Sequence, residues 1–223
     1  MYGACVMWSQ YIKSAFGIWV LSIANGASAG EVPAVGVDLE PSAASMRVYG
    51  SAEPPHGFVS FCQENPSECA PNSNVDMRPA ATPQHLRELD EVNRRVNQEI
   101  KPEPDLEHYG VNEYWTLPMD GRGDCEDYAL LKRHELMRLG WPSSALLITV
   151  VRDERGEGHA VLTAHTAEGD LILDNKVNEV RLWSSTPYQF LLRQSAANPR
   201  AWSSLAPTHD LAPLPIAVLR QHH

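Results

Sequence analysis

Cys125 has the sequence surroundings of a nucleophile. It lies in the stretch GRGDCEDY (residues 121–128), which is charged and rich in glycine and leads into a helix-like apolar pattern. Backbone N–H groups at a helix N-terminus favour a thiolate. The same groups can stabilise the oxyanion that forms when a thiolate attacks a carbonyl carbon. The position therefore predicts a reactive cysteine rather than a small buried hydrophobic residue.

A thiol nucleophile needs a base, and the base needs a third group to orient it. His159 opens an apolar segment and Asp174 ends the next one, so the order Cys, His, Asp is that of papain-like sites. A tight turn at Glu168-Gly169 would pair Thr163 with Asp174, however, and would leave His159 about 13 Å away along the strand. A bulge or a different turn is needed to bring the two together. His165 is the competing base.

Acidic residues surround the cysteine: Asp120, Asp124, Glu126 and Asp127. Nearby carboxylates raise the pKa of a cysteine and suppress the thiolate. A bound Ca²⁺ ion would compensate, since calcium prefers clustered oxygen ligands. Arg122 could also supply the positive charge. The acidic residues could equally be a solvated helix start, which the helix dipole favours.

The elements that must position these residues are helices followed by strands. A helix is expected from Pro83, with Thr82 as N-cap, until Pro102 and Pro104 stop it. A second helix should run from about residue 124 or 125 to 139, with Gly140 as its C-terminal cap. Strands are expected at 145–151, 159–165 and 171–174, and a short strand or helix within 183–193. Helices first and antiparallel strands after predict an α+β fold.

The N-terminus resembles an export signal. Lys13 precedes an apolar run over residues 15–24, and Ala27-Ser28-Ala29 offers a small-x-small cleavage site. The run is shorter than the roughly 20 apolar residues that span a membrane. We therefore expect residues 1–29 to be removed and the mature chain to be periplasmic.

The mature chain keeps three of the four cysteines, because Cys5 leaves with the signal. Cys62 and Cys69 are seven residues apart and are the natural disulfide pair in an oxidising compartment, which leaves Cys125 over. The expected organisation is a signal peptide, a Pro-rich irregular arm, a catalytic domain and a Pro-rich tail, in that order: residues 1–29, 30–81, 82–204 and 205–223.

Charge narrows the possible partners. The chain of 223 residues has 18 basic and 28 acidic side chains, for a net charge of −10. Nucleic acids and anionic membranes need a basic surface, so neither is expected as the main partner.

Four segments resemble the bacterial transglutaminase-like cysteine proteinases, a family that includes LapG-type periplasmic proteases. They are WTLP (115–118), GDCEDYA (123–129), GHAVL (158–162) and LDN (173–175), within roughly residues 82–202. The resemblance implies a papain/transglutaminase-like fold, with the nucleophilic cysteine at a helix N-terminus packed on an antiparallel sheet. The arm at 50–80 and the tail are where the sequence departs from the LapG type.

The resemblance also implies roles for single residues. Cys125 would be the nucleophile, His159 the base and Asp174 the orienting group. A Ca²⁺ site beside the cysteine would be formed by Asp124 and Glu126, with Asp127 close by.

LapG-type enzymes cut a surface adhesin, and a membrane receptor for cyclic-di-GMP sequesters them. The implied function is thus a periplasmic, calcium-dependent cysteine endopeptidase with a protein substrate such as an adhesin and with such a receptor as partner. Two alternatives stay open. One is acyl transfer by the same triad, as a transglutaminase or a cell-wall amidase. The other is a calcium-binding module without catalysis.

Overall fold

The computed structural model describes residues 44–70 and 77–207. The expected signal and the last sixteen residues of the tail (208–223) lie outside these ranges. Among the helices within them, none is long and apolar enough to cross a membrane.

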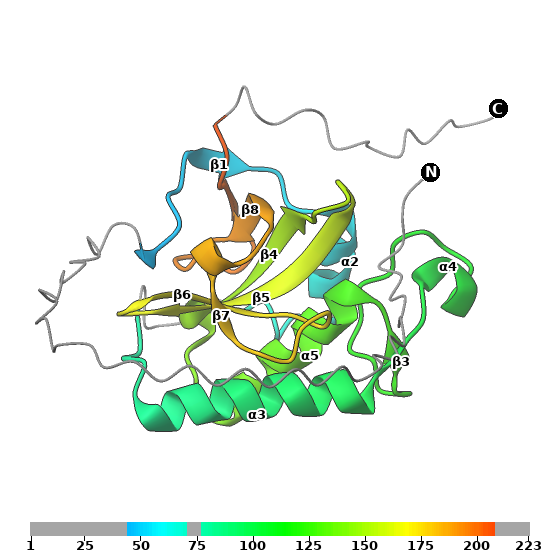
Figure 1. Ribbon diagram of the computed structural model, residues 1–223. Helices are drawn as coiled ribbons and strands as arrows, with labels where there is room; N and C mark the ends of the chain where they lie inside the picture. Colours follow the sequence, from blue (N-terminus) through cyan, green and yellow to red (C-terminus); the bar gives the residue numbers. More distant parts are fainter. Residues whose placement is uncertain (1–43, 71–76, 208–223) are drawn as a thin grey trace, which may run out of the picture.

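An antiparallel sheet forms the centre of the molecule (Figure 1). Within the described residues the sheet has seven strands, in the spatial order β1 (Gly50–Ala52), β9 (Trp202–Ser204), β8 (Gln189–Gln194), β4 (Leu146–Arg152), β5 (Gly158–Thr166), β6 (Gly169–Leu173) and β7 (Arg181–Leu182). Sequence neighbours β4, β5 and β6 are also neighbours in the sheet, whereas β8 and β9 return to the other side of β4. The α+β fold expected from the sequence is confirmed, with the strands expected at 145–151, 159–165 and 171–174.

The β5–β6 hairpin has a different register from the one expected. Thr166 pairs with Gly169, so the turn is Ala167-Glu168 and Thr163 faces Ile172 rather than Asp174. The segment before helix α3 (Pro83–Glu99) holds this turn: the Ala167 N–H donates to the Pro79 carbonyl, 3.1 Å away. Asp174 thereby moves two residues closer to His159 than the expected pairing allows. No local pattern encodes a contact between segments almost ninety residues apart.

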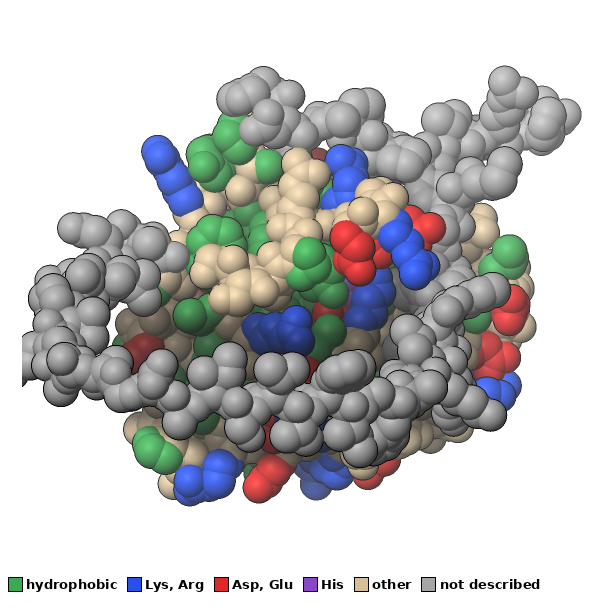
Figure 2. Space-filling model, in the orientation of Figure 1, with side chains coloured by type: hydrophobic (Ala, Val, Ile, Leu, Met, Phe, Trp, Pro, Cys, Tyr) green, Lys and Arg blue, Asp and Glu red, His purple; other side chains and the backbone are tan. Residues whose placement is uncertain are grey.

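Two helices cover one face of the sheet (Figure 1), α3 (Pro83–Glu99) and α5 (Cys125–Arg138). Thr82 caps α3 as expected, because its hydroxyl accepts from the His85 N–H at 3.2 Å. Gly140 follows α5 with a φ of 98°, a left-handed conformation that suits glycine. Acidic and basic side chains line the outer side of α3 (Figure 2), while its apolar side is buried.

The core has a part on each face of the sheet. Toward the helices, Leu146, Ile148, Leu162 and Leu173 pack with buried side chains of α3 and α5. On the opposite face a smaller cluster is formed by Met46, Val151, Val161, Ile172, Phe190 and Leu205. Burial on both faces explains why the β4 sequence is almost continuously apolar.

Part of the arm expected to be irregular belongs to this fold. Gly50–Ala52 adds the edge strand β1 to β9, and α2 (His56–Glu64) buries Phe58 and Phe61 in the core. The sequence reading missed both elements because the nearby prolines obscure such short patterns. Gly57 is needed in α2, since a Cβ there would lie 2.3 Å from the Trp115 ring.

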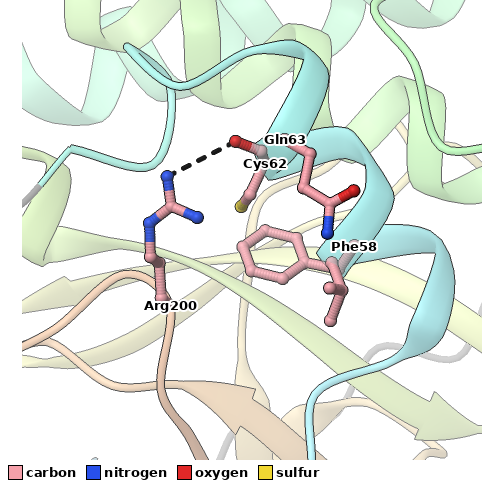
Figure 3. A pocket seen from close by; sticks show the side chains of 5 residues that line it. Phe58, Cys62, Gln63 and Arg200 are labelled. Atoms are coloured by element: carbon pink, nitrogen blue, oxygen red, sulfur yellow. Dashed lines mark hydrogen bonds between the residues drawn. The ribbon is translucent and has the colours of Figure 1, made fainter.

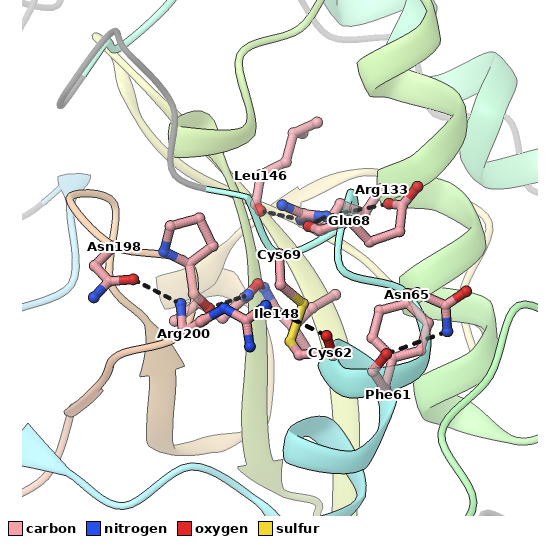
Figure 4. The surroundings of a disulfide bond; sticks show 12 residues. Phe61, Cys62, Asn65, Glu68, Cys69, Arg133, Leu146, Ile148, Asn198 and Arg200 are labelled. Carbon is pink, nitrogen blue, oxygen red and sulfur yellow. Dashed lines mark hydrogen bonds and ion pairs between the residues drawn. A yellow bond between two sulfur atoms is a disulfide. The ribbon is translucent and has the colours of Figure 1, made fainter.

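The expected Cys62–Cys69 disulfide is present (Figure 4). It ends a turn that places Glu68 beside α5, where Arg133 donates to the Glu68 carbonyl at 2.9 Å and to the Leu146 carbonyl at 3.1 Å. The bridge thus fixes the end of α2 against the central helix and strand β4.

A pocket of about 130 Å³ lies beside the same bridge (Figure 3). Arg200 at its edge donates to the Cys62 carbonyl at 3.4 Å. The pocket is lined by Phe58, Val59, Cys62, Gln63 and Arg200. None of the residues with candidate catalytic roles lines it.

Candidate active site

Cys125 is the first residue of α5, as expected, and Asp124 is the N-cap position. The side chain is buried. Its Sγ atom lies 3.1 Å from Glu126 Oε2 and 3.3 Å from the backbone nitrogen of Ala160. The sulfur therefore sits against strand β5 at the residue that follows His159.

The disulfide pair expected from the sequence is the one observed, since Cys62 and Cys69 bond to each other. Cys125 takes no part in that bridge. Catalysis requires Cys125 as a thiol that can lose its proton to form the thiolate.

His159 and Asp174 form a buried pair. His159 Nε2 lies 2.9 Å from Asp174 Oδ1, which also accepts from the Lys176 N–H at 3.0 Å. The Tyr188 hydroxyl donates to the other oxygen, Asp174 Oδ2. Because Asp174 engages Nε2, the imidazole turns its Nδ1 atom away from the carboxylate.

The carboxyl of Asp174 is held in its charged form. Burial alone would raise its pKa, but the hydrogen bond and charge of His159, with the Tyr188 hydroxyl, lower the pKa to about 2. An ionised carboxylate on Nε2 orients the ring and stabilises an imidazolium, which is the task of the third group in such a site.

Helix α3 supports the segment that carries Asp174. Asn97 donates from its side chain to the Asp174 carbonyl at 2.9 Å. Asn93 donates to the carbonyls of Val177 and Asn178. These asparagines lie one turn apart on α3, beside its apolar stripe. Amide side chains in that position, next to the buried residues, are the sequence signal that could have identified them.

His165, the competing base, is bound elsewhere. Its Nδ1 atom hydrogen-bonds Asp170 Oδ1. Arg193 donates to Asp170 Oδ2 at 2.9 Å, and the Met46 N–H donates to the same oxygen at 2.7 Å. All the named contacts of His165 are thus within a buried polar network that does not include Cys125.

Three buried carboxyl groups meet beside the cysteine. Asp105, Asp124 and Glu126 have oxygens within 4.8 Å of one another. Burial raises the pKa of Asp105 to about 7, and repulsion from Asp124 adds to the effect. Burial, followed by repulsion from Asp124, also raises the pKa of Glu126 well above its usual range. Such a group is unfavourable without a cation, and its hard oxygen ligands suit Ca²⁺.

The structure brings Asp124 and Glu126 together as expected but places Asp127 outside this group. Asp127 Oδ1 instead accepts from the Thr116 N–H at 2.9 Å. Asp120 lies at the surface, where it pairs with His108 and Arg122. Arg122 also pairs with Glu103 at 3.0 Å and is 44% exposed. Its charge is therefore neutralised away from the buried carboxyl groups.

Two acidic residues that lie in this region were not expected there from the sequence. Asp105 begins the short helix α4 (Asp105–His108), and Glu113 adds to the repulsion that raises the pKa of Glu126. Both lie in the long loop before the cysteine. A parallel pair of two-residue strands, β2 (Lys101–Pro102) and β3 (Arg122–Gly123), draws the two ends of that loop together, a contact that local patterns do not reveal.

A cysteine at the start of a helix that packs on an antiparallel sheet, with a His on one strand paired to an Asp that directly follows the next strand, is the arrangement of a transglutaminase-like cysteine peptidase. Residues 48–210 match the model of one family, the bacterial transglutaminase-like cysteine proteinases. The chain belongs to this family and is a cysteine peptidase of the transglutaminase-like type.

Solved structures of LapG from Legionella pneumophila are similar. The calcium-bound form has 24% sequence identity and a TM-score of 0.48, and the match covers 67% of this chain and 79% of that one. The EGTA-treated form has 27% identity and a TM-score of 0.44, covering 61% and 71%. A search of curated proteins gives no match.

Proposed function

We propose that this chain is a calcium-dependent cysteine endopeptidase in which Cys125, His159 and Asp174 form the triad. The observation that carries the proposal is the buried pair of His159 Nε2 and Asp174 Oδ1, 2.9 Å apart, next to a cysteine sulfur that touches the backbone of residue 160. A nucleophile, a base and an oriented partner are thus within one small region.

In the first step His159 takes the proton of reduced Cys125 through Nδ1, and the thiolate attacks the carbonyl carbon of a peptide bond. The first-turn N–H groups of α5 face the developing oxyanion. The C–N bond then breaks as the imidazolium gives its proton to the leaving amine, which leaves a thioester on Cys125. In the second step His159 deprotonates a water molecule, which attacks the thioester and releases the acid and the thiol.

The residues present fit a Ca²⁺ ion. Asp105, Asp124 and Glu126 supply clustered oxygens, and buried oxygens of Asp105 and Asp124 have no hydrogen-bond partner among the described residues. When bound, the ion would neutralise these carboxylates and so lower the cost of a thiolate at Cys125. The three carboxylates also link α4 to the start of α5, which orients the nucleophile.

The proposed setting is the periplasm. The signal-like residues 1–29 and the Cys62–Cys69 bridge both suit an exported protein. An adhesin-like surface protein is the proposed substrate, and a cyclic-di-GMP receptor in the inner membrane is the proposed regulator. Both follow from the resemblance to LapG-type enzymes.

Cell-surface proteomics tests the proposal. Cells with the wild-type chain should show new protein N-termini that are missing in cells with Cys125→Ala. An added amine that is incorporated at the acyl group, in competition with water, would instead indicate a transglutaminase. Identical N-termini in both strains, with no amine incorporation, would contradict both enzymatic functions.

A further inference from the structure

The strand ladder does not by itself bring His159 and Asp174 together. Pairing between β5 and β6 ends with Leu162 opposite Leu173. Continued in the same register, the ladder would place residue 176 opposite His159, two residues beyond Asp174. The segment after β6 must therefore leave the strand direction, and contacts outside the ladder must hold it in place.

Lys176 makes two contacts that hold this segment. Its backbone N–H donates to Asp174 Oδ1 at 3.0 Å, so the carboxylate closes a turn on its own backbone. The Lys176 ammonium group donates to Asp153 Oδ2 at 2.8 Å. One residue thus joins the carboxylate partner of His159 to the turn between β4 and β5.

Asp153 shapes the turn that leads into His159. Its Oδ1 atom accepts from the N–H groups of Arg155 and Glu157, both at 2.9 Å. Its own N–H donates to the Glu157 carbonyl at 2.9 Å, and strand β5, which carries His159, begins at the next residue. Burial acts to raise the pKa of Asp153, but the Lys176 ammonium and the two N–H groups hold that pKa below its usual value.

We propose that Lys176 is a positioning residue for the proposed His159–Asp174 dyad: its bridge to Asp153 holds the turn before the base and the segment after β6 at a fixed separation. The inference rests on the triad proposed above. Asn97 anchors the same segment to helix α3 through the Asp174 carbonyl, whereas the bridge anchors it to the turn that precedes the base. Since a misplacement of about 1 Å can slow catalysis about a hundredfold, the bridge acts on the rate.

Burial distinguishes this ion pair from others in the same segment. The side chain of Asp153 is 4% exposed and that of Lys176 is 24% exposed. Arg181 and Glu179 form a neighbouring pair at 3.5 Å, with side chains 45% and 61% exposed. Exposed pairs of that kind contribute little to structure, so Arg181 provides a matched control.

The first test is a kinetic comparison of calcium-loaded variants of the mature chain. The probe is a fluorogenic peptide that spans a cleavage site found by the proteomics described above. Lys176→Met should lower kcat about tenfold and change KM less than about twofold, because the dyad is misplaced while peptide binding is not. Lys176→Arg keeps the charge and should restore kcat to within about twofold of the wild type. Arg181→Met should leave both constants unchanged.

A double-mutant cycle tests whether the lysine acts through its partner. Asp153→Asn keeps an oxygen for the turn N–H groups but loses the charge that binds Lys176, so it should have the same effect as Lys176→Met. The double variant should then be no slower than either single variant. Multiplied losses in the double variant would overturn the inference. A return to wild-type kcat would also overturn it, because an unpaired charge rather than a lost bridge would then explain the single variants.

Proton exchange of the His159 ring measures the geometry without a substrate. Its Nε2–H donates to the Asp174 carboxylate, and the resonance is identified in ¹H–¹⁵N NMR spectra by its loss in His159→Ala. Lys176→Met should speed exchange of this proton with water about tenfold, and Arg181→Met should not. Wild-type exchange in a folded Lys176→Met protein would overturn the inference, and so would loss of folding in both Lys176→Met and Asp153→Asn. Failure of the proposed function is distinguishable, since the wild-type chain would then not cleave the peptide while the exchange rates still decide the role of Lys176.

Discussion

Tyr188 contacts both partners of the proposed dyad. Its hydroxyl donates to Asp174 Oδ2, and its ring packs edge-on against the His159 imidazole, with centroids 5.6 Å apart at 68°. One side chain from the segment before β8 thus fixes the carboxylate and the plane of the base. A single substitution can remove the hydroxyl of Tyr188 and keep its ring, so the two contributions can be measured separately.

Tyr188→Phe keeps the ring and removes the hydrogen bond to Asp174. We expect kcat/KM to fall about tenfold, the equivalent of one hydrogen bond of about 1.4 kcal/mol, and the melting temperature to change little. Tyr114→Phe is the matched control, since that hydroxyl makes only a long, exposed contact of 3.4 Å to Glu64. Full activity of Tyr188→Phe would show that Asp174 does not need the hydrogen bond from the Tyr188 hydroxyl.

The two candidate bases have different partners: His159 pairs with Asp174, and His165 pairs with Asp170. His159→Ala should reduce kcat by at least about a thousandfold, because general-base catalysis and ring orientation are lost together. Cys125→Ser should be equally inactive, since a hydroxyl is a far weaker nucleophile.

His165→Ala should keep the activity of each folded molecule. It should lower the melting temperature instead, because the buried carboxylate of Asp170 loses one of its partners. An active His159→Ala protein together with an inactive, well-folded His165→Ala protein would assign the base to His165.

The sequence predicts those elements whose signals are local. Helix α3 begins at its Thr82-Pro83 signal, and α5 begins at Cys125 and ends before Gly140. The core strands follow their apolar runs. The sequence also offers Cys125, His159 and Asp174 as candidates for the triad. It does not give the distance between the last two, since the hairpin register depends on the distant Pro79–Ala81 segment.

The candidate metal site shows the same limit. Asp124 and Glu126 flank the cysteine and are visible in the sequence, whereas Asp105 reaches them only through the folding of the intervening loop. Asp127 looks equivalent in the sequence, but the helix turns it toward the Thr116 backbone. Proximity along a chain therefore predicts a ligand only when the helical phase agrees.

The role of Asp105 as a calcium ligand, which the sequence did not suggest, can be tested directly. Asp105→Asn should weaken Ca²⁺ binding at least about tenfold and reduce activity at limiting calcium, because one charged ligand is lost. Asp127→Asn replaces a carboxyl group in the same region without touching the three-carboxyl group, and should bind Ca²⁺ more nearly like the wild type. Isothermal titration calorimetry measures both affinities. Stronger weakening by Asp127→Asn than by Asp105→Asn would assign the ligand role to Asp127.

The disulfide should stabilise the fold rather than the chemistry. Replacing Cys62 and Cys69 together by Ala should lower the free energy of unfolding by about 2–3 kcal/mol, the value expected for closing so short a loop. Activity of the folded fraction should persist, because the bridge lies with Glu68 and Arg133 at the other end of α5. Urea unfolding with and without reductant gives the difference. A double variant that unfolds at the same urea concentration as the wild type would contradict this expectation.

Calcium should reverse the dependence of stability on pH. Without calcium, burial raises the pKa of Asp105 to about 7 and that of Asp127 to about 9, against about 3.9 in an unfolded chain. The native state then binds more protons than the unfolded state, so the free energy of unfolding falls as the pH rises from about 4 toward 7 and beyond. Asp174 acts in the opposite sense. Its pKa of about 2 gives stability that is present above about pH 4 and is lost as the pH falls toward 2.

The calcium-free protein should therefore be most stable near pH 4 to 5, and its melting temperature in EGTA should drop by at least about 5 °C between pH 5 and pH 8. With saturating Ca²⁺ the carboxylates are neutralised by the ion, and binding to the native state alone adds stability at pH 8, where the ligands are ionised. Asp105→Asn should flatten the curve in EGTA, because it removes one of the groups that lose a proton. Circular dichroism melts across pH 4 to 8, in EGTA and in calcium, measure both curves. If the two curves coincide and neither changes in Asp105→Asn, the three-carboxyl group holds no calcium.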